Sequence, residues 1–133
     1  MKILFVCKYN RFRSKIAEAY FKKINKNPKI KTISAGVIKG KPTPLSTVKT
    51  AKKLGIIVPR KTNFLDENIL ESKKLKYIVI VANDVPRQIF KRFNKKIILW
   101  KIRDTSVSDQ KKVEKIIKEI MKKVNNLNKS LEK

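Results

Sequence analysis

The chain has 133 residues, enough for one domain with a buried core, and its 41% hydrophobic content argues against disorder. Its 35 basic and 10 acidic residues give a net charge of +25, which favours anionic ligands. The single cysteine excludes an intrachain disulfide framework, and no apolar stretch approaches the roughly 18 residues of a membrane span. We therefore expect one domain over residues 1–133, located in the cytoplasm and without a membrane partner.

The first predicted elements are a buried strand over residues 2–6, a short loop and a helix. Cys7 directly follows the strand, and Arg13 stands six positions after Cys7. Apolar residues then recur at helical spacing from Ile16 to Ile24. The pattern predicts a tight loop at the start of a helix, with a thiol at one end and a guanidinium at the other.

Such a loop is suited to phosphate, because free backbone N–H groups at a helix N-terminus converge on an anion. Arg13 offers a planar fork of donors for two phosphoryl oxygens, and positive surroundings favour the nucleophilic thiolate of Cys7. A hydroxyl donor to that thiolate can come from Ser14. We expect the whole loop to bind substrate: Lys8, Tyr9, Asn10, Arg11, Phe12, Arg13 and Ser14. The alternative is that Cys7 is a small apolar residue that closes a core strand.

Strands and helices alternate in the rest of the chain, as in a parallel sheet covered on both faces. The expected strands are 31–34, 77–81 and 96–100. The expected helices are one through 48–54, a brief one over 67–71 with Asp66 as its N-cap, one over 85–93, and a closing helix through 113–124. Ser106 and Asp109 resemble a capping box for the closing helix. From Asn125 to residue 133 we expect a polar tail that frays.

These motifs together resemble the low-molecular-weight protein tyrosine phosphatases and their relatives, the thioredoxin-coupled arsenate reductases. The resemblance is carried by the Cys-x5-Arg-Ser loop, by Ala17-Glu18-Ala19, by Ile33-Ser34-Ala35-Gly36 and by Gly40-x-Pro42. It implies an α/β three-layer open sandwich, with a four-stranded parallel sheet in the flavodoxin-like order 2-1-3-4 and helices on both faces.

The resemblance also implies site roles beyond the loop. Asp104, in the loop after the last strand, matches the general acid of the family, although an aspartate there is often only a turn residue. Asn10 matches a loop asparagine that tolerates left-handed backbone geometry, and Ser34 matches a residue that ties the loop in place. Asp109 is the competing carboxylate, and its position in the capping motif makes it the structural one.

The implied reaction is hydrolysis of a phosphomonoester through a cysteinyl-phosphate, with Cys7, Arg13 and Asp104 as catalytic residues. We expect no metal and no cofactor, since the chain has no histidine and no cluster of metal ligands. The expected partner is a phosphorylated substrate, either a phosphotyrosine protein or a small phosphomonoester. We expect a monomer, with a weak dimer as the alternative.

Several positions depart from the family pattern. Tyr9 replaces the usual loop glycine, and Phe12 replaces the second loop cysteine that many members carry. Thr105, rather than proline, follows Asp104, and no aromatic residue comes after it. Tyrosine specificity is therefore left open by the sequence.

Two other functions compete with the phosphatase. Because the chain lacks the two further cysteines of the thioredoxin-coupled reductases, an arsenate reductase would need an external thiol. A basic nucleic-acid-binding protein is the second alternative, but 29 of the basic residues are lysines scattered along the chain, and no known nucleic-acid motif occurs. We therefore expect no specific nucleic-acid partner.

Overall fold

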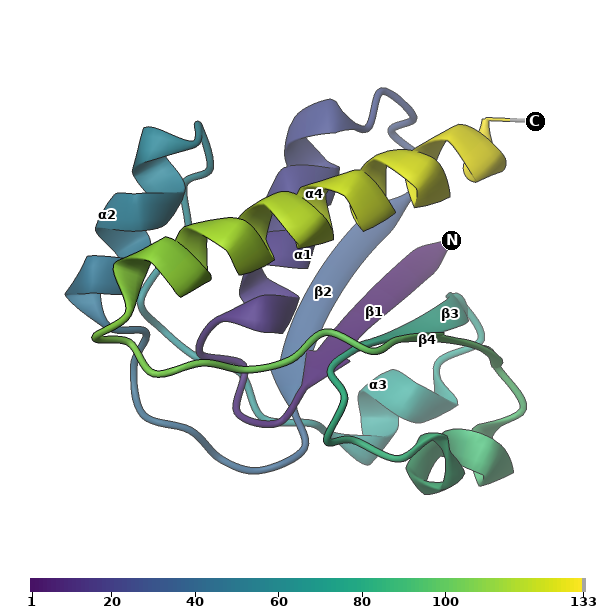
Figure 1. Ribbon diagram of the computed structural model, residues 1–133. Helices are drawn as coiled ribbons and strands as arrows, with labels where there is room; N and C mark the ends of the chain where they lie inside the picture. Colours follow the sequence, from purple (N-terminus) through teal and green to yellow (C-terminus); the bar gives the residue numbers. More distant parts are fainter. Residues whose placement is uncertain (133) are drawn as a thin grey trace.

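Four parallel strands form the central sheet of the computed structural model, which describes residues 1–132 (Figure 1). The strands are β1 (Lys2–Cys7), β2 (Lys31–Gly36), β3 (Leu75–Val81) and β4 (Lys96–Trp100), and they lie in the order β2-β1-β3-β4. The predicted α/β fold and the strand order 2-1-3-4 are therefore confirmed.

Helices cover both faces of this sheet because successive side chains of each strand point to opposite sides. On one face Ile3 and Phe5 of β1 belong to a core shared with α1 (Arg13–Ile24), α2 (Leu45–Lys53) and α4 (Gln110–Leu131). On the other face Leu4 and Val6 pack in a second core with α3 (Glu67–Glu71) and the 3-10 helix η1 (Arg87–Phe93). β1 is thus buried on both sides, as its continuous apolar run predicted.

The closing helix differs from the prediction at both ends. It continues to Leu131, so the expected fraying from Asn125 is wrong within the described residues: Leu127 is buried, and the Tyr20 hydroxyl donates a hydrogen bond of 3.1 Å to Asn125 Oδ1. The capping box is also wrong. Asp109 is itself the N-cap, accepting from the Lys112 N–H at 3.2 Å, whereas the Ser106 hydroxyl bonds Ser108.

The other predicted elements need small corrections. Asp66 caps α3 as expected, accepting from the Asn68 N–H at 2.6 Å. The second strand runs two residues further than predicted, to Gly36, and the helix expected over 85–93 begins at Arg87. Within residues 1–132, no helix combines the length and apolarity needed to cross a membrane.

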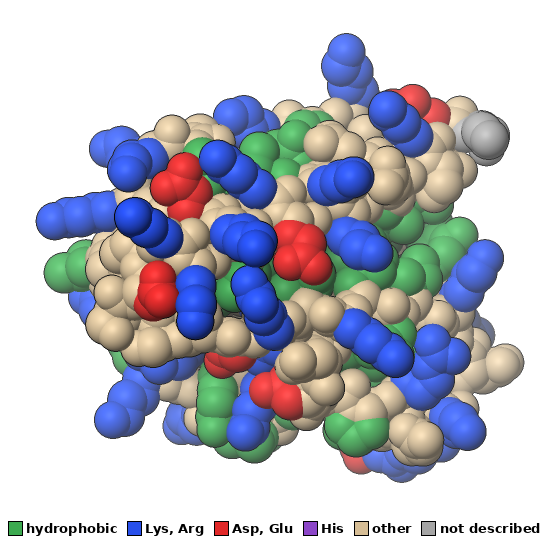
Figure 2. All heavy atoms as spheres, viewed as in Figure 1, with side chains coloured by type: hydrophobic (Ala, Val, Ile, Leu, Met, Phe, Trp, Pro, Cys, Tyr) green, Lys and Arg blue, Asp and Glu red, His purple; other side chains and the backbone are tan. Residues whose placement is uncertain are grey.

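Cationic side chains are spread over the face of the molecule shown in Figure 2, with a few acidic side chains between them. They follow α4 and the segments around it without gathering into one patch. On this face the positive charge is therefore distributed rather than concentrated at one site.

Candidate active site

The segment between Cys7 and Arg13 curls into a loop at the carboxyl end of β1. Asn10 makes the reversal possible: its φ of 57° is in the left-handed region, which asparagine tolerates better than most residues. The Asn10 side chain is fully buried, and its amide nitrogen donates to the hydroxyls of Ser14 at 2.7 Å and Ser34 at 3.0 Å. Its Oδ1 accepts from the Asn63 N–H at 2.8 Å. One amide thus fixes the loop against three segments.

Cys7 is only 2% exposed and closes β1 at the base of this loop. Its Sγ lies 3.0 Å from the Ser14 hydroxyl, at the first turn of α1. The hydroxyl can therefore donate to a thiolate, as the sequence predicted. The positive end of the α1 dipole points toward the same region.

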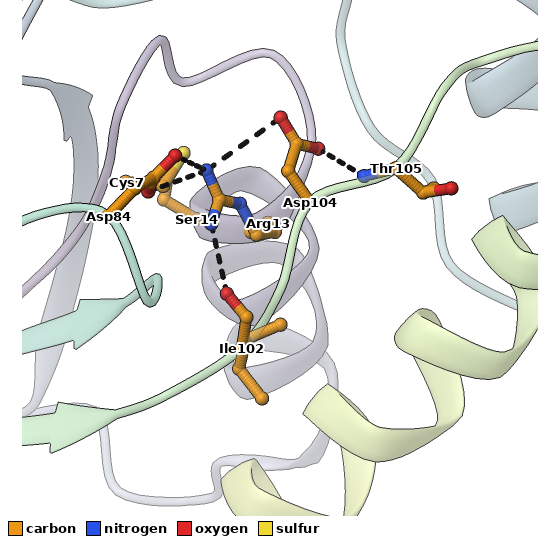
Figure 3. Close-up of polar contacts among 7 residues, drawn as sticks. All are labelled: Cys7, Arg13, Ser14, Asp84, Ile102, Asp104 and Thr105. Atoms are coloured by element: carbon orange, nitrogen blue, oxygen red, sulfur yellow. Dashed lines mark hydrogen bonds and ion pairs between the residues drawn. The ribbon is translucent and has the colours of Figure 1, made fainter.

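Arg13 lies beside Cys7 with its side chain 2% exposed. Its Nη1 donates to the Ile102 carbonyl at 2.9 Å, and its Nη2 lies 3.1 Å from Asp84 Oδ1 (Figure 3). Asp104 Oδ2 is 3.8 Å from the same nitrogen, while its other oxygen accepts from the Thr105 N–H at 2.9 Å. The structure therefore brings Arg13 and the predicted Asp104 together, although the two are far apart in the chain.

Sequence reasoning missed Asp84. It lies just beyond the end of β3, at the same sheet edge as Cys7, and its carboxylate compensates the charge of the buried Arg13. The signal was present: polar Asn83 and Asp84 follow a buried parallel strand at the end where ligands bind in such sheets. Their pairing with Arg13 depends on the strand order.

A second layer of contacts supports the loop from behind. The Ser34 hydroxyl donates to Glu18 Oε1 at 2.6 Å, and Glu18 also forms an ion pair of 2.8 Å with Lys22. Lys15 is 3% exposed and donates to the Lys61 carbonyl. Burial lowers the pKa of Lys15, and the charge of Glu18 opposes this shift. Ser34 thus lies next to the loop, where a supporting residue was predicted. The supporting contacts of Glu18 and Lys15 were not predicted.

Two glycines let neighbouring segments approach the loop backbone. A Cβ on Gly36 would lie 2.6 Å from the Tyr9 carbonyl carbon, and one on Gly40 would lie 2.4 Å from the Tyr9 carbonyl oxygen. Real Cβ atoms do not come so close to backbone atoms, so any side chain at either position would push the segments apart.

A pocket of about 60 Å³ opens above Cys7. The predicted site residues that line it are Cys7, Tyr9, Arg11, Phe12, Arg13 and Asp104. The facing wall is formed by Pro44, Thr47, Thr105, Val107 and Val113. Of the other predicted residues, Asn10, Ser14 and Ser34 are buried behind the loop, and the Lys8 ammonium lies over the Tyr9 ring, 5.2 Å from its centroid.

This arrangement places a thiol, a guanidinium and a carboxylate around one small pocket, next to the start of a helix. The positive groups and backbone N–H groups suit a tetrahedral oxyanion, and the carboxylate suits proton transfer to or from it. Within residues 1–132, no three histidine, cysteine, aspartate or glutamate side chains are grouped so as to hold a metal ion.

Solved structures share this fold along nearly the full chain. The YwlE arginine phosphatase from Geobacillus stearothermophilus superimposes with a TM-score of 0.83 at 19% identity, covering 98% of this chain and 92% of its own. A low molecular weight protein tyrosine phosphatase from T. tengcongensis gives 0.82 at 23%, covering 98% and 99%. An arsenate reductase from Archaeoglobus fulgidus gives 0.74 at 24%, covering 95% and 98%. At such identities these likenesses establish the fold alone.

No curated protein sequence matches the chain. The sequence model of the low molecular weight phosphotyrosine protein phosphatases, in contrast, matches residues 2–133. Because this match covers almost the whole chain and agrees with the sheet order, the chain belongs to the low molecular weight phosphotyrosine protein phosphatase family.

Proposed function

We propose that this protein hydrolyses phosphomonoesters through a cysteinyl-phosphate intermediate, with aryl phosphates such as phosphotyrosine as the first substrate class to test. The observation that carries the proposal is the buried Cys7 Sγ, 3.0 Å from the Ser14 hydroxyl and in the same pocket as Arg13. Family membership supports a phosphorylated substrate.

In the proposed first step the Cys7 thiolate attacks phosphorus, and the bond from phosphorus to the ester oxygen breaks. Asp104 gives its proton to the departing oxygen, and a cysteinyl-phosphate is left. Arg13 and the loop N–H groups hold the phosphoryl oxygens in the transition state, where their charge is greatest. The 3.8 Å between Asp104 Oδ2 and Arg13 Nη2 supports this role, because it places the carboxylate beside the anion site.

In the second step a water molecule attacks phosphorus and gives a proton to the Asp104 carboxylate. The sulfur–phosphorus bond breaks, and inorganic phosphate and the Cys7 thiolate are released. Ser14 donates a hydrogen bond to the thiolate in the free enzyme. Asn10 and Ser34 act indirectly, by holding the loop in its curled form.

The walls of the pocket support an aryl substrate. Tyr9 and Phe12 both line it, and Tyr9 is 36% exposed, so part of an aromatic side chain is accessible to a substrate ring. Tyr9, which replaces the usual loop glycine, thereby compensates for the missing aromatic residues after Asp104.

Arsenate reduction is the second candidate, because arsenate has the shape and charge of phosphate and one structural neighbour is the arsenate reductase from Archaeoglobus fulgidus. Cys7 is the only cysteine, so the thiol that completes such a reduction has to come from a separate molecule.

The test compares the wild type with Cys7→Ser. We expect the wild type to hydrolyse p-nitrophenyl phosphate, with trapping of a phosphorylated Cys7 on rapid quenching. We expect Cys7→Ser to lose turnover while still binding inorganic phosphate in calorimetry. Aryl phosphate hydrolysis that survives in Cys7→Ser would refute the assignment of the nucleophile. Consumption of a small thiol that depends on arsenate, without hydrolysis of any ester, would favour the reductase.

A further inference from the structure

The pocket contains a second guanidinium group, that of Arg11, which differs from Arg13 in its surroundings. Arg11 is partly buried, and its Nε donates to the Pro42 carbonyl at 3.3 Å. Gly40 lies under the same side chain, since a Cβ there would be 3.3 Å from Arg11 Cγ. The stem of Arg11 is therefore held against the loop before α2.

The terminal nitrogens of Arg11 have no partner among residues 1–132. Arg11 forms no ion pair there, whereas Arg13 is compensated by Asp84 at 3.1 Å. The sequence around Arg11 carries no negative charge either, because residues 1–17 contain no aspartate or glutamate. An anchored arginine with free donors is arranged to bind an anion with little further loss of side-chain entropy.

In the proposed mechanism one phosphoryl group does not need both arginines, because the loop N–H groups and Arg13 hold its oxygens. Arg11 lines the same pocket as Cys7, so an anion bound to Arg11 would lie close to a phosphoryl group at Cys7. Resting on the proposed phosphatase function, we infer that Arg11 forms a second anion subsite, and that the preferred substrate is a small phosphomonoester carrying another anionic group, a carboxylate or a second phosphate.

The experiment measures kcat/KM for phenyl phosphates with a carboxylate at the ortho, meta or para position and for their methyl esters. The readout is the kcat/KM of each carboxylate divided by that of its methyl ester. Comparing this ratio between variants removes the effect of the different leaving groups. We expect Arg11→Gln to lower the ratio about tenfold or more for the best isomer, as for a lost charge-assisted hydrogen bond. Arg11→Lys should retain part of the preference for the carboxylate, since a lysine keeps the positive charge but not the planar pair of donors.

Lys76→Gln is the matched control. Lys76 is exposed near the amino end of β3, opposite the pocket edge, and its loss removes the same charge from the protein. We expect the ratio of this variant to equal that of the wild type. An equal fall in Lys76→Gln and Arg11→Gln would show a general charge effect and overturn the inference, as would an Arg11→Gln variant that slows both substrates equally.

A separate binding arm keeps this inference distinct from the proposed function. Calorimetry with carboxybenzylphosphonates and their methyl esters, which cannot be hydrolysed, reports the subsite even if no ester is turned over. Carboxylate preference that depends on Arg11 supports the subsite, and its absence overturns it. The last arm uses phosphotyrosine peptides with flanking aspartates or alanines. A preference for the aspartate peptides that depends on Arg11, with no such preference for the small carboxylated phosphates, would overturn the assignment to small substrates.

Discussion

Replacing Asp84 by asparagine would remove the charge that compensates Arg13 and change little else. Asparagine has nearly the same shape, and its Oδ1 can still accept a hydrogen bond from the guanidinium. The Arg13 side chain is 2% exposed and that of Asp84 36%, with 3.1 Å between Nη2 and Oδ1. Asp84→Asn therefore isolates the contribution of one negative charge next to a buried positive one.

The magnitude follows from this distance and exposure. Two unit charges at 3.1 Å attract each other by about 1.3 kcal/mol in bulk water and by about 5 kcal/mol at an effective dielectric constant near 20. Solvent around the part-exposed Asp84 screens the pair, and desolvation offsets part of the gain. We expect Asp84→Asn to lower the free energy of unfolding by about 1–2 kcal/mol, or the Tm by roughly 3–8 °C.

The assay is urea unfolding followed by circular dichroism in phosphate-free buffer. Glu67→Gln provides the control, because it removes the same charge from an ion pair with Arg92 whose partners are 65% and 66% exposed. Such surface pairs contribute less than about 1 kcal/mol. We also expect saturating phosphate to reduce the difference in free energy of unfolding between Asp84→Asn and the wild type, since the bound anion would compensate the charge of Arg13. A loss of unfolding free energy no larger than that of Glu67→Gln would refute the reasoning. So would a difference between Asp84→Asn and the wild type that phosphate leaves unchanged.

Four further outcomes are expected. Asp104→Asn should slow the hydrolysis of aryl phosphates with poor leaving groups by about 10²-fold or more and that of aryl phosphates with good leaving groups only little. Asp109→Asn should leave both rates unchanged, since asparagine caps a helix equally well. The reverse pattern would identify Asp109 as the acid. Burial lowers the pKa of Lys15, so between that lowered pKa and about 10.4 the unfolded chain binds more protons. The free energy of unfolding of the wild type, relative to that of Lys15→Met, should therefore rise with pH across this window in urea titrations, and a constant difference would contradict this. Gly40→Ala should weaken phosphate binding in calorimetry, because its Cβ would meet the Tyr9 carbonyl oxygen at 2.4 Å. Unchanged affinity for phosphate would mean that the loop with Gly40 and the loop with Tyr9 are free to separate. Finally, kcat/KM for p-nitrophenyl phosphate should fall between about 20 and 200 mM salt, as screening weakens the attraction of the dianion to the basic protein, and a salt-independent value would exclude such steering.

The sequence by itself determined the features that depend on neighbours along the chain. The apolar run of β1 predicts a strand buried on both faces, and the spacing of Cys7 and Arg13 predicts the loop that joins it to α1. The role of Asn10 came from the family resemblance, and its φ of 57° agrees with the left-handed geometry that asparagine tolerates. Local patterns failed where two polar residues compete for one role. Ser106 and Asp109 both suit a helix start, and the structure uses only Asp109 as the N-cap.

The tertiary structure alone decided which distant side chains complete the site. Asp84 lies 71 positions from Arg13 and meets it because β3 pairs with β1. Asn63 likewise reaches Asn10 from 53 positions away, and Arg11 reaches Pro42 from 31. The helical tail beyond Asn125 belongs here too, since the packing of α4 against α1 stabilises residues too polar to predict a helix. Such contacts depend on strand order and on the crossing of helices, and no local periodicity encodes either of them.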